Sequence, residues 1–85
     1  MTIVYHKAFL KTYKKLSLKI KNKFKERLAI FIEDKFNPVL NNHALRGKYQ
    51  GYRSINVTGD IRAIFKRTAK EAIFVTVDSH SNLYN

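Results

Sequence analysis

The spacing of apolar residues changes once along the chain, and this change restricts the fold more than any other feature. Between residues 6 and 35, apolar side chains recur every three or four positions, as they do on one face of a helix. The pair Asn37-Pro38 then ends the helical pattern, because a residue that precedes proline disfavours helical backbone angles. The runs that follow are β-prone and are separated by short turns. Helices followed by a series of strands are typical of an α+β fold.

The same patterns give the expected elements. We expect strands at residues 2–5, 51–57, 61–67 and 72–77, and helices at residues 6–16 and 17–35. Ser17 is the expected N-cap of the second helix. Residues 39–50 have no regular pattern, and residues 78–85 form a polar tail. Because the last three strands are joined by hairpin-length turns, the predicted order is β-α-α-β-β-β, with a helix hairpin packed on one face of an antiparallel-rich sheet and the other face open.

Length and composition exclude several classes of protein. A chain of 85 residues has room for one modest core, so we expect a single domain at residues 1–85. The absence of cysteine excludes disulfides, thiolate catalysis and cysteine-ligated zinc. No run approaches the roughly 20 apolar residues of a membrane span, and the first residues lack the apolar core of a signal peptide. These features predict a cytoplasmic protein with no membrane partner.

Charge is the strongest signal in the composition. The chain has 17 lysines and arginines against 6 acidic residues, a formal net charge of +11. Such an excess attracts polyanions, because neutralised phosphates release their counterions. Residues 1–35 carry nine lysines and only one arginine, Arg27, whereas arginines dominate residues 46–67. Arginine offers a planar fork for bidentate phosphate contacts, so the second half of the chain is the expected nucleic-acid site.

Three histidines are the side chains best suited to proton transfer near neutral pH. His6 lies at a strand–helix junction, where a capping role is expected. His43 and His80 lie in polar segments beside strands, where catalytic groups concentrate. The histidines lack the close spacing of a zinc site, and no glycine pattern for binding phosphate is present, so we expect no metal or other cofactor. A triad of Ser79, His80 and Asp60 lacks the surrounding pattern of a nucleophile elbow.

Metal-free RNA cleavage suits this set of residues better. The reaction needs a base for the 2′-hydroxyl, an acid for the leaving 5′-oxygen and cations for the phosphate. Two histidines, or one histidine and Asp60, could share the proton transfers. Arg46, Arg53 and Arg62 could hold the phosphate, and Tyr84 could stack on a base or donate its hydroxyl. The alternatives are a solvated strand face for the arginines and packing on the core for Tyr84.

Three ordered segments in the second half resemble the YafQ-type toxins of the RelE-like superfamily. His43-Ala-Leu-Arg-Gly-Lys-Tyr-Gln-Gly-Tyr-Arg53 is similar to their H-x-L-x-G-x-x-x-G-Y-R segment. Residues 54–65 are similar to the strand–turn–strand that follows it, with an aspartate at the turn. Asp78-Ser-His-Ser-Asn-Leu-Tyr84 resembles the closing G-T-H-x-x-L-F/Y. The resemblance covers residues 43–84, and the β-α-α opening agrees only as a pattern.

This resemblance implies a RelE-like fold and a ribosome-dependent endoribonuclease that cuts messenger RNA on the 70S ribosome. It also implies a co-expressed acidic antitoxin that holds the toxin inactive in a hetero-oligomeric complex. By position, the implied catalytic residues are His43, Asp60, His80 and Tyr84. The expected RNA-binding residues are Arg46, Lys48, Arg53, Asn56 and Arg62.

Two positions depart from the family pattern, and two other functions remain open. Asn56 stands where YafQ-type toxins can carry an active-site histidine, and an amide cannot transfer a proton. Ile61 replaces an aromatic residue found in some relatives. The alternatives are a basic RNA- or ribosome-binding protein that blocks translation without cleavage, and a toxin of the same fold that acts on DNA gyrase, as ParE-like proteins do. His43 and His80 argue against the gyrase-directed alternative, which requires no acid–base pair.

Overall fold

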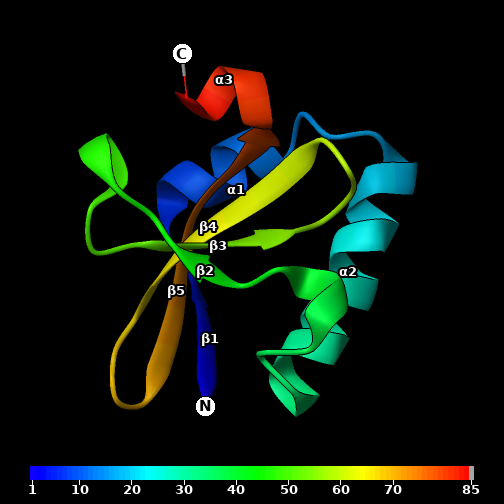
Figure 1. The fold of residues 1–85 in the computed structure, drawn as a ribbon. Helices are drawn as coiled ribbons and strands as arrows, with labels where there is room; N and C mark the ends of the chain where they lie inside the picture. The colour runs from blue at the N-terminus through cyan, green and yellow to red at the C-terminus, as the bar shows by residue number, and fades with distance from the viewer. Residues whose placement is uncertain (85) are drawn as a thin grey trace.

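The computed structural model describes residues 1–84, whose five strands form one mixed sheet (Figure 1). The strands are β1 (Thr2–Tyr5), β2 (His43–Ala44), β3 (Arg53–Asn56), β4 (Ile61–Arg67) and β5 (Glu71–Ser79). They lie in the order β1-β5-β4-β3-β2. β1 runs parallel to β5, and the other neighbouring pairs are antiparallel. The predicted α+β class with an antiparallel-rich sheet is therefore confirmed.

Three α-helices and two short 3-10 helices complete the fold. They are α1 (Lys7–Tyr13), α2 (Leu18–Glu33), η1 (Pro38–Leu40), η2 (Gly47–Tyr49) and α3 (His80–Tyr84). Figure 1 shows α1 behind the sheet, α2 along one side of it, and α3 beyond the end of β5. None of the described helices has the length and apolarity that crossing a bilayer requires.

The first turns of both long helices are fixed by side-chain caps. His6 Nδ1 accepts a hydrogen bond from the Ala8 amide at 3.0 Å and begins α1. Ser17 Oγ accepts from the Ile20 amide at 3.3 Å and begins α2, as predicted. The first helix ends at Tyr13, short of the predicted residue 16, because the chain turns toward the cap of the second helix.

Replacing Ser17 by alanine removes the α2 cap and leaves the Ile20 amide without its acceptor. The free energy of unfolding should fall by about 0.5–2 kcal/mol, measured as a lower urea midpoint with an unchanged slope. Ser17→Asp keeps a capping oxygen and should restore most of the loss. Equal losses in both variants would show that the cap does not stabilise the helix.

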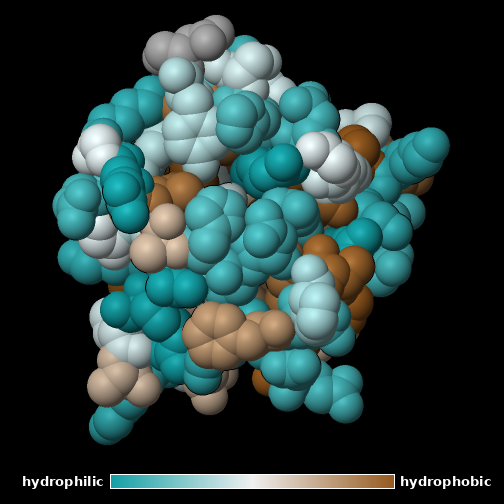
Figure 2. Space-filling model, viewed as in Figure 1, coloured by the Kyte–Doolittle hydropathy of each residue, from teal (hydrophilic) through white to brown (hydrophobic). Residues whose placement is uncertain are grey.

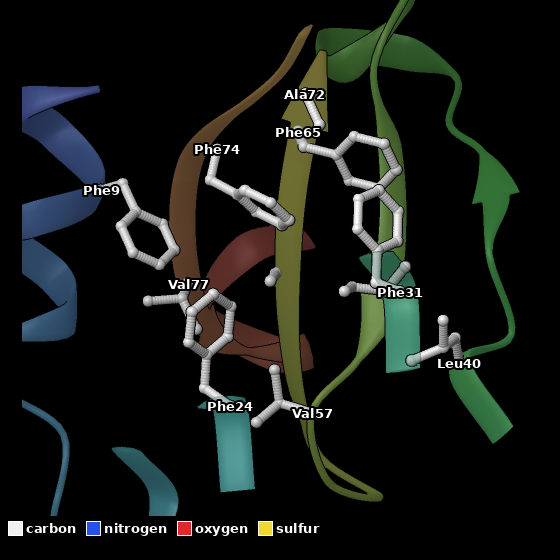
Figure 3. Packing of buried hydrophobic residues seen from close by; sticks show 11 residues of the cluster. Phe9, Phe24, Phe31, Leu40, Val57, Phe65, Ala72, Phe74 and Val77 are labelled. Atoms are coloured by element: carbon white, nitrogen blue, oxygen red, sulfur yellow. The ribbon is translucent and has the colours of Figure 1, made fainter. Parts of the chain in front are cut away.

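The main core lies between these helices and one face of the sheet. Phe74 of β5 is at its centre, with ring centroids 5.8 Å from Phe9, 5.7 Å from Phe24, 5.8 Å from Phe31 and 5.3 Å from Phe65. Figure 3 shows the rings from α1 and α2 turned toward the strands. All five rings are buried. This cluster holds both helices on the same face of the sheet.

Three features differ from the sequence-based expectation. Residues 39–50 are not wholly irregular, because they contain β2 and parts of the two 3-10 helices. The polar tail is also ordered, since β5 extends to Ser79 and α3 follows it; the last residue of that tail, Asn85, lies outside the described residues. The second face is not fully open either. Leu45, Ile64 and Leu83 form a smaller buried cluster on it, beneath η2 and α3.

Candidate active site

A row of polar residues crosses the sheet face that α1 and α2 do not cover. The register pairs Asn56 with Arg62 and Arg62 with Asp78, so these three residues lie side by side on β3, β4 and β5. Their sequence neighbours Ile55, Ala63 and Val77 belong to the main core. Because successive strand residues face opposite sides, the three polar residues face away from the helices. We call them the polar row.

His80 and Asp60 meet at one end of this row. The backbone amide of His80 donates a 2.9 Å hydrogen bond to the carbonyl of Asp60. Asp60 is in the β3–β4 turn, and His80 is the first residue of α3. The start of α3 is fixed by Ser79 Oγ, which accepts from the Asn82 amide at 3.2 Å, and by Asp78 Oδ1, which accepts from the Asn82 side-chain amide at 3.0 Å. Two residues that are far apart in sequence are thus adjacent.

Arg62 stabilises the turn that carries Asp60. Its Nη1 donates to the carbonyl of Thr58 at 3.0 Å and to that of Gly59 at 2.8 Å. The same turn is closed by Thr58 Oγ1, which accepts from the Asp60 and Ile61 amides. Since the bonds use one guanidinium nitrogen, the others remain available to an anion. Arg62 therefore combines a structural role with the position expected of a phosphate ligand.

Aromatic side chains flank His80. Its ring lies 4.7 Å from that of Tyr84, which packs edge-on against Tyr49 at 6.0 Å. Lys48 Nζ lies over the Tyr49 ring, 5.3 Å from its centroid. Burial, and to a smaller extent the nearby Tyr84 and Asp78, raises the pKa of the Tyr49 phenol. Its hydroxyl is therefore protonated at neutral pH and can donate a hydrogen bond. The sequence analysis missed Tyr49, because only its packing on Tyr84 places it here.

His43 lies on the edge strand β2, opposite Ser54 of β3. Its Nδ1 is 2.7 Å from the carbonyl oxygen of Asn41, which can only accept, so Nδ1 carries the hydrogen and Nε2 of the neutral ring is an acceptor. Asn41 has a φ of 47°, a left-handed conformation that asparagine tolerates. β3 and β4 separate β2 from β5, which ends at the residue before His80, and three strand spacings amount to about 14 Å. The structure does not bring His43 and His80 together.

Two buried polar atoms of β3, the strand that pairs with β2, lack partners. Ser54 Oγ and Asn56 Oδ1 are buried and have no hydrogen-bond partner among the described residues. Such atoms are normally satisfied by protein, water or ligand. Ser54 was not predicted as a site residue, although its place two residues before Asn56 puts both on one face of β3. These oxygens can accept hydrogen bonds from a substrate or an ordered water.

The predicted RNA-binding residues do not form one group. Lys48 lies near His80 because it packs on Tyr49, which contacts Tyr84. Arg62 lies near His80 because it holds the β3–β4 turn. Arg46 is exposed at the start of η2. Arg53 lies on the other side of the sheet, because it pairs with Phe65 of the main core. Its Nε donates to Asn42 Oδ1 at 2.8 Å, which holds the residue before His43. The structure thus gives Arg53 a supporting position behind the polar row.

The cationic side chains around the site form no ion pairs within residues 1–84. Among residues 1–84 the only ion pair joins Lys23 Nζ to Glu26 Oε1 at 3.4 Å, on α2. The face in Figure 2 is mainly hydrophilic, and its apolar side chains gather mostly over α2. No group of three or more His, Cys, Asp or Glu side chains within residues 1–84 is arranged to hold a metal ion. Within residues 1–84, the lysines and arginines around the site therefore have no carboxylate at ion-pair distance.

The sequence matches the family described as the bacterial toxin of a type II toxin–antitoxin system, YafQ, over residues 1–85. No curated protein matches it. The fold is similar to the crystal structure of YafQ from E. coli strain BL21(DE3), with a TM-score of 0.83, 26% identity and coverage of 98% of this chain and 97% of that one. YafQ in the E. coli DinJ–YafQ toxin–antitoxin complex gives a TM-score of 0.80 and 28% identity, over 98% and 96% of the chains. A YoeB/ParE toxin from Agrobacterium tumefaciens shares the fold, with a TM-score of 0.75 at 15% identity over 94% and 99%.

Proposed function

We propose that this chain, which belongs to the YafQ family of bacterial type II toxin–antitoxin toxins, is an endoribonuclease that cleaves messenger RNA on the ribosome. The observation that carries the proposal is the backbone hydrogen bond that joins His80 to Asp60, beside a turn held by Arg62. Two sequence segments, the β3–β4 turn with the start of β4 and the start of α3, thereby bring a candidate proton-transfer pair and a cation to one end of the sheet. These are the groups that cleavage by a 2′-hydroxyl requires.

In the proposed reaction, the RNA supplies its own nucleophile. The 2′-oxygen attacks the adjacent phosphorus, its proton passes to one member of the His80–Asp60 pair, and the bond from phosphorus to the 5′-oxygen breaks. The other member of the pair protonates the leaving oxygen. Arg62 stabilises the charge on the phosphate, and Tyr84 packs against a base. The products are a 2′,3′-cyclic phosphate and a 5′-hydroxyl end, and the step needs no metal or cofactor.

His43 has a different proposed role. It is paired with Ser54 of β3 on the edge strand β2, and β3 and β4 separate it from β5, which leads into His80. We assign it to binding the neighbouring nucleotide, where it accepts a hydrogen bond from a hydroxyl or a base. Arg46 and Lys48 supply further contacts to the RNA backbone.

The proposed partner in the resting state is an antitoxin protein. E. coli YafQ has been crystallised with DinJ as a toxin–antitoxin complex, and this chain is similar to that YafQ along nearly its whole length. A net charge of +11 favours an acidic partner. The two proteins would form a hetero-oligomer in the cytoplasm, and release of the antitoxin would expose the polar row.

The test maps RNA ends in a bacterial translation extract with one defined messenger. The wild-type protein should produce new 5′-hydroxyl ends only on translated messenger, and Asp60→Asn should reduce their rate of formation by about 10²-fold, the lower end of a general acid–base contribution. His6→Asn is the matched control, because it removes an imidazole but keeps a side chain able to cap α1. Arrested translation with intact messenger would contradict the proposal and favour a blocking protein, whereas unaffected translation together with inhibition of DNA gyrase would favour a gyrase-directed toxin.

A further inference from the structure

A cavity of about 250 Å³ lies on the helix-covered side of the sheet, away from the polar row. It is lined by Lys35, Phe36, Asn42, Arg53, Phe65 and Arg67. Three of these six residues are cationic, and no carboxylate lines the cavity. Phe65 is buried in the core, whereas Phe36 leaves 60% of its surface exposed. The cavity thus combines an apolar floor with a cationic rim.

The hydrogen-bonding capacity of the two arginines is only partly used. Arg53 bonds Asn42 through Nε and, more weakly, Nη2, and its guanidinium lies over the Phe36 ring at 5.6 Å. Arg67 Nη1 donates to the carbonyls of Thr68 and Glu71, and its buried Nε has no acceptor. Within residues 1–84 neither arginine has a carboxylate at ion-pair distance. A carboxylate that entered the cavity would therefore be the first ionic partner of either guanidinium group.

We propose that this cavity is a docking site for a carboxylate-bearing, partly apolar peptide segment of a protein partner. The partner is the antitoxin class named above, so this inference rests on the proposed toxin–antitoxin pairing. An acidic side chain would pair with the guanidinium groups, and a neighbouring aliphatic side chain would cover Phe36 and Phe65. Such a contact matches both halves of the cavity, the cationic rim and the apolar floor.

The geometry favours a peptide over RNA at this position. Binding of single-stranded RNA relies on an aromatic face on which a base can stack. At Phe36 that face is shared with two cations, Lys35 Nζ at 5.7 Å and the Arg53 guanidinium at 5.6 Å from the ring centroid, so the exposed remainder of the ring suits a small aliphatic side chain better than a base. The cavity also lies on the far side of the sheet from Arg62 and His80. RNA bound here would not lead to the candidate active site, whereas a partner protein can hold both faces.

The test is an NMR titration of the ¹⁵N-labelled full chain carrying His80→Ala, which permits expression. The probe is the peptide acetyl-Glu-Leu-Glu-Leu-amide, and acetyl-Gln-Leu-Gln-Leu-amide is its neutral control. Only the acidic peptide should shift the side-chain Nε–H signals of Arg53 and Arg67 and the amide signal of Phe36. Arg67→Gln, which leaves the Arg53–Asn42 bond in place, should weaken binding about tenfold, as expected for loss of one charge-assisted contact.

Lys19→Gln is the control for a general loss of positive charge, because it removes one positive charge from an exposed site on α2. This variant should bind the acidic peptide as the parent does. Equal weakening in both variants, unshifted Arg53 and Arg67 signals, or tighter binding of an oligouridylate at the cavity would each overturn the proposal. Because no cleavage is measured, these outcomes are independent of whether the chain is a ribonuclease.

Discussion

His80→Ala should lower the rate of messenger cleavage by about 10²–10⁴-fold, the usual contribution of a general acid or base. The imidazole has no structural hydrogen bond among the described residues, and the backbone bond from residue 80 to Asp60 does not depend on the side chain. The fold should therefore survive, and the loss should appear in the rate of the chemical step. Counting 5′-hydroxyl ends over time on ribosomes with a single messenger measures this rate.

A modified substrate separates the role of His80 from that of its partner. Replacing the leaving 5′-oxygen by sulfur removes the need for a general acid, because a thiolate leaves without protonation. If His80 is the acid, the sulfur substrate should restore cleavage by His80→Ala to near the wild-type rate. If the substrate rescues Asp60→Asn instead, the two roles are reversed. Full cleavage by His80→Ala on the natural messenger would exclude His80 from the mechanism.

His43→Ala is the matched comparison, because it also removes one imidazole from the same face. The structure separates His43 from the His80–Asp60 pair, so its loss should weaken binding of the RNA, with an effect on the rate of about tenfold or less. A loss as large as that of His80→Ala would show that His43 reaches the scissile phosphate in the ribosomal complex.

Phe74→Ala should be the most destabilising single substitution, with a loss of about 3–5 kcal/mol in the free energy of unfolding. The ring of Phe74 is fully buried and lies within 6.2 Å of five other aromatic rings from α1, α2, β1 and β4. Its removal leaves a cavity where both helices meet the sheet. Since small domains are stable by only about 5–15 kcal/mol, a large share of the stability would be lost.

Urea unfolding of the variant in the His80→Ala background measures this loss without toxicity to the host. Leu18→Ala is the control, because Leu18 lies on α2 with 72% of its surface exposed. Its effect should stay within about 0.5 kcal/mol. A loss below about 1 kcal/mol for Phe74→Ala would mean that the aromatic cluster collapses around the cavity.

The long elements could be predicted from sequence because each repeats its pattern several times. Two helices, the Ser17 cap and four of the five strands could be predicted from the residue patterns. β2 could not be found, since two residues cannot show an alternation. α3 spans five residues and buries only Leu83, so its sequence resembles a polar loop. The irregularity near Ile64 and Phe65, which shifts the register of β5, also leaves no mark in the sequence.

Several residues of the candidate site could be proposed from the sequence, but their arrangement could not. The adjacency of Asp60 and His80 depends on the register between β4 and β5, which includes that shift. The side of the sheet on which Arg53 lies could have been predicted from the sequence. Ile55 and Val57 are core residues on the same strand run, and a period of two puts Arg53 on their side. The resemblance to the family motif favoured an RNA-binding role for Arg53, whereas the alternation of residues along the strand puts it on the core side.

The pairing of β1 with β5 also determines when, during its synthesis, the chain can fold into a toxin. β1 joins β5 in a register that sets Thr2 beside Glu71 and Tyr5 beside Phe74. At about 5–20 residues per second, synthesis supplies β5 several seconds after β1. Contacts this distant in sequence cannot form earlier, and they slow folding further. We therefore expect the nascent chain to lack the folded toxin until β5 has been made, which gives an antitoxin already present time to meet the toxin as it folds.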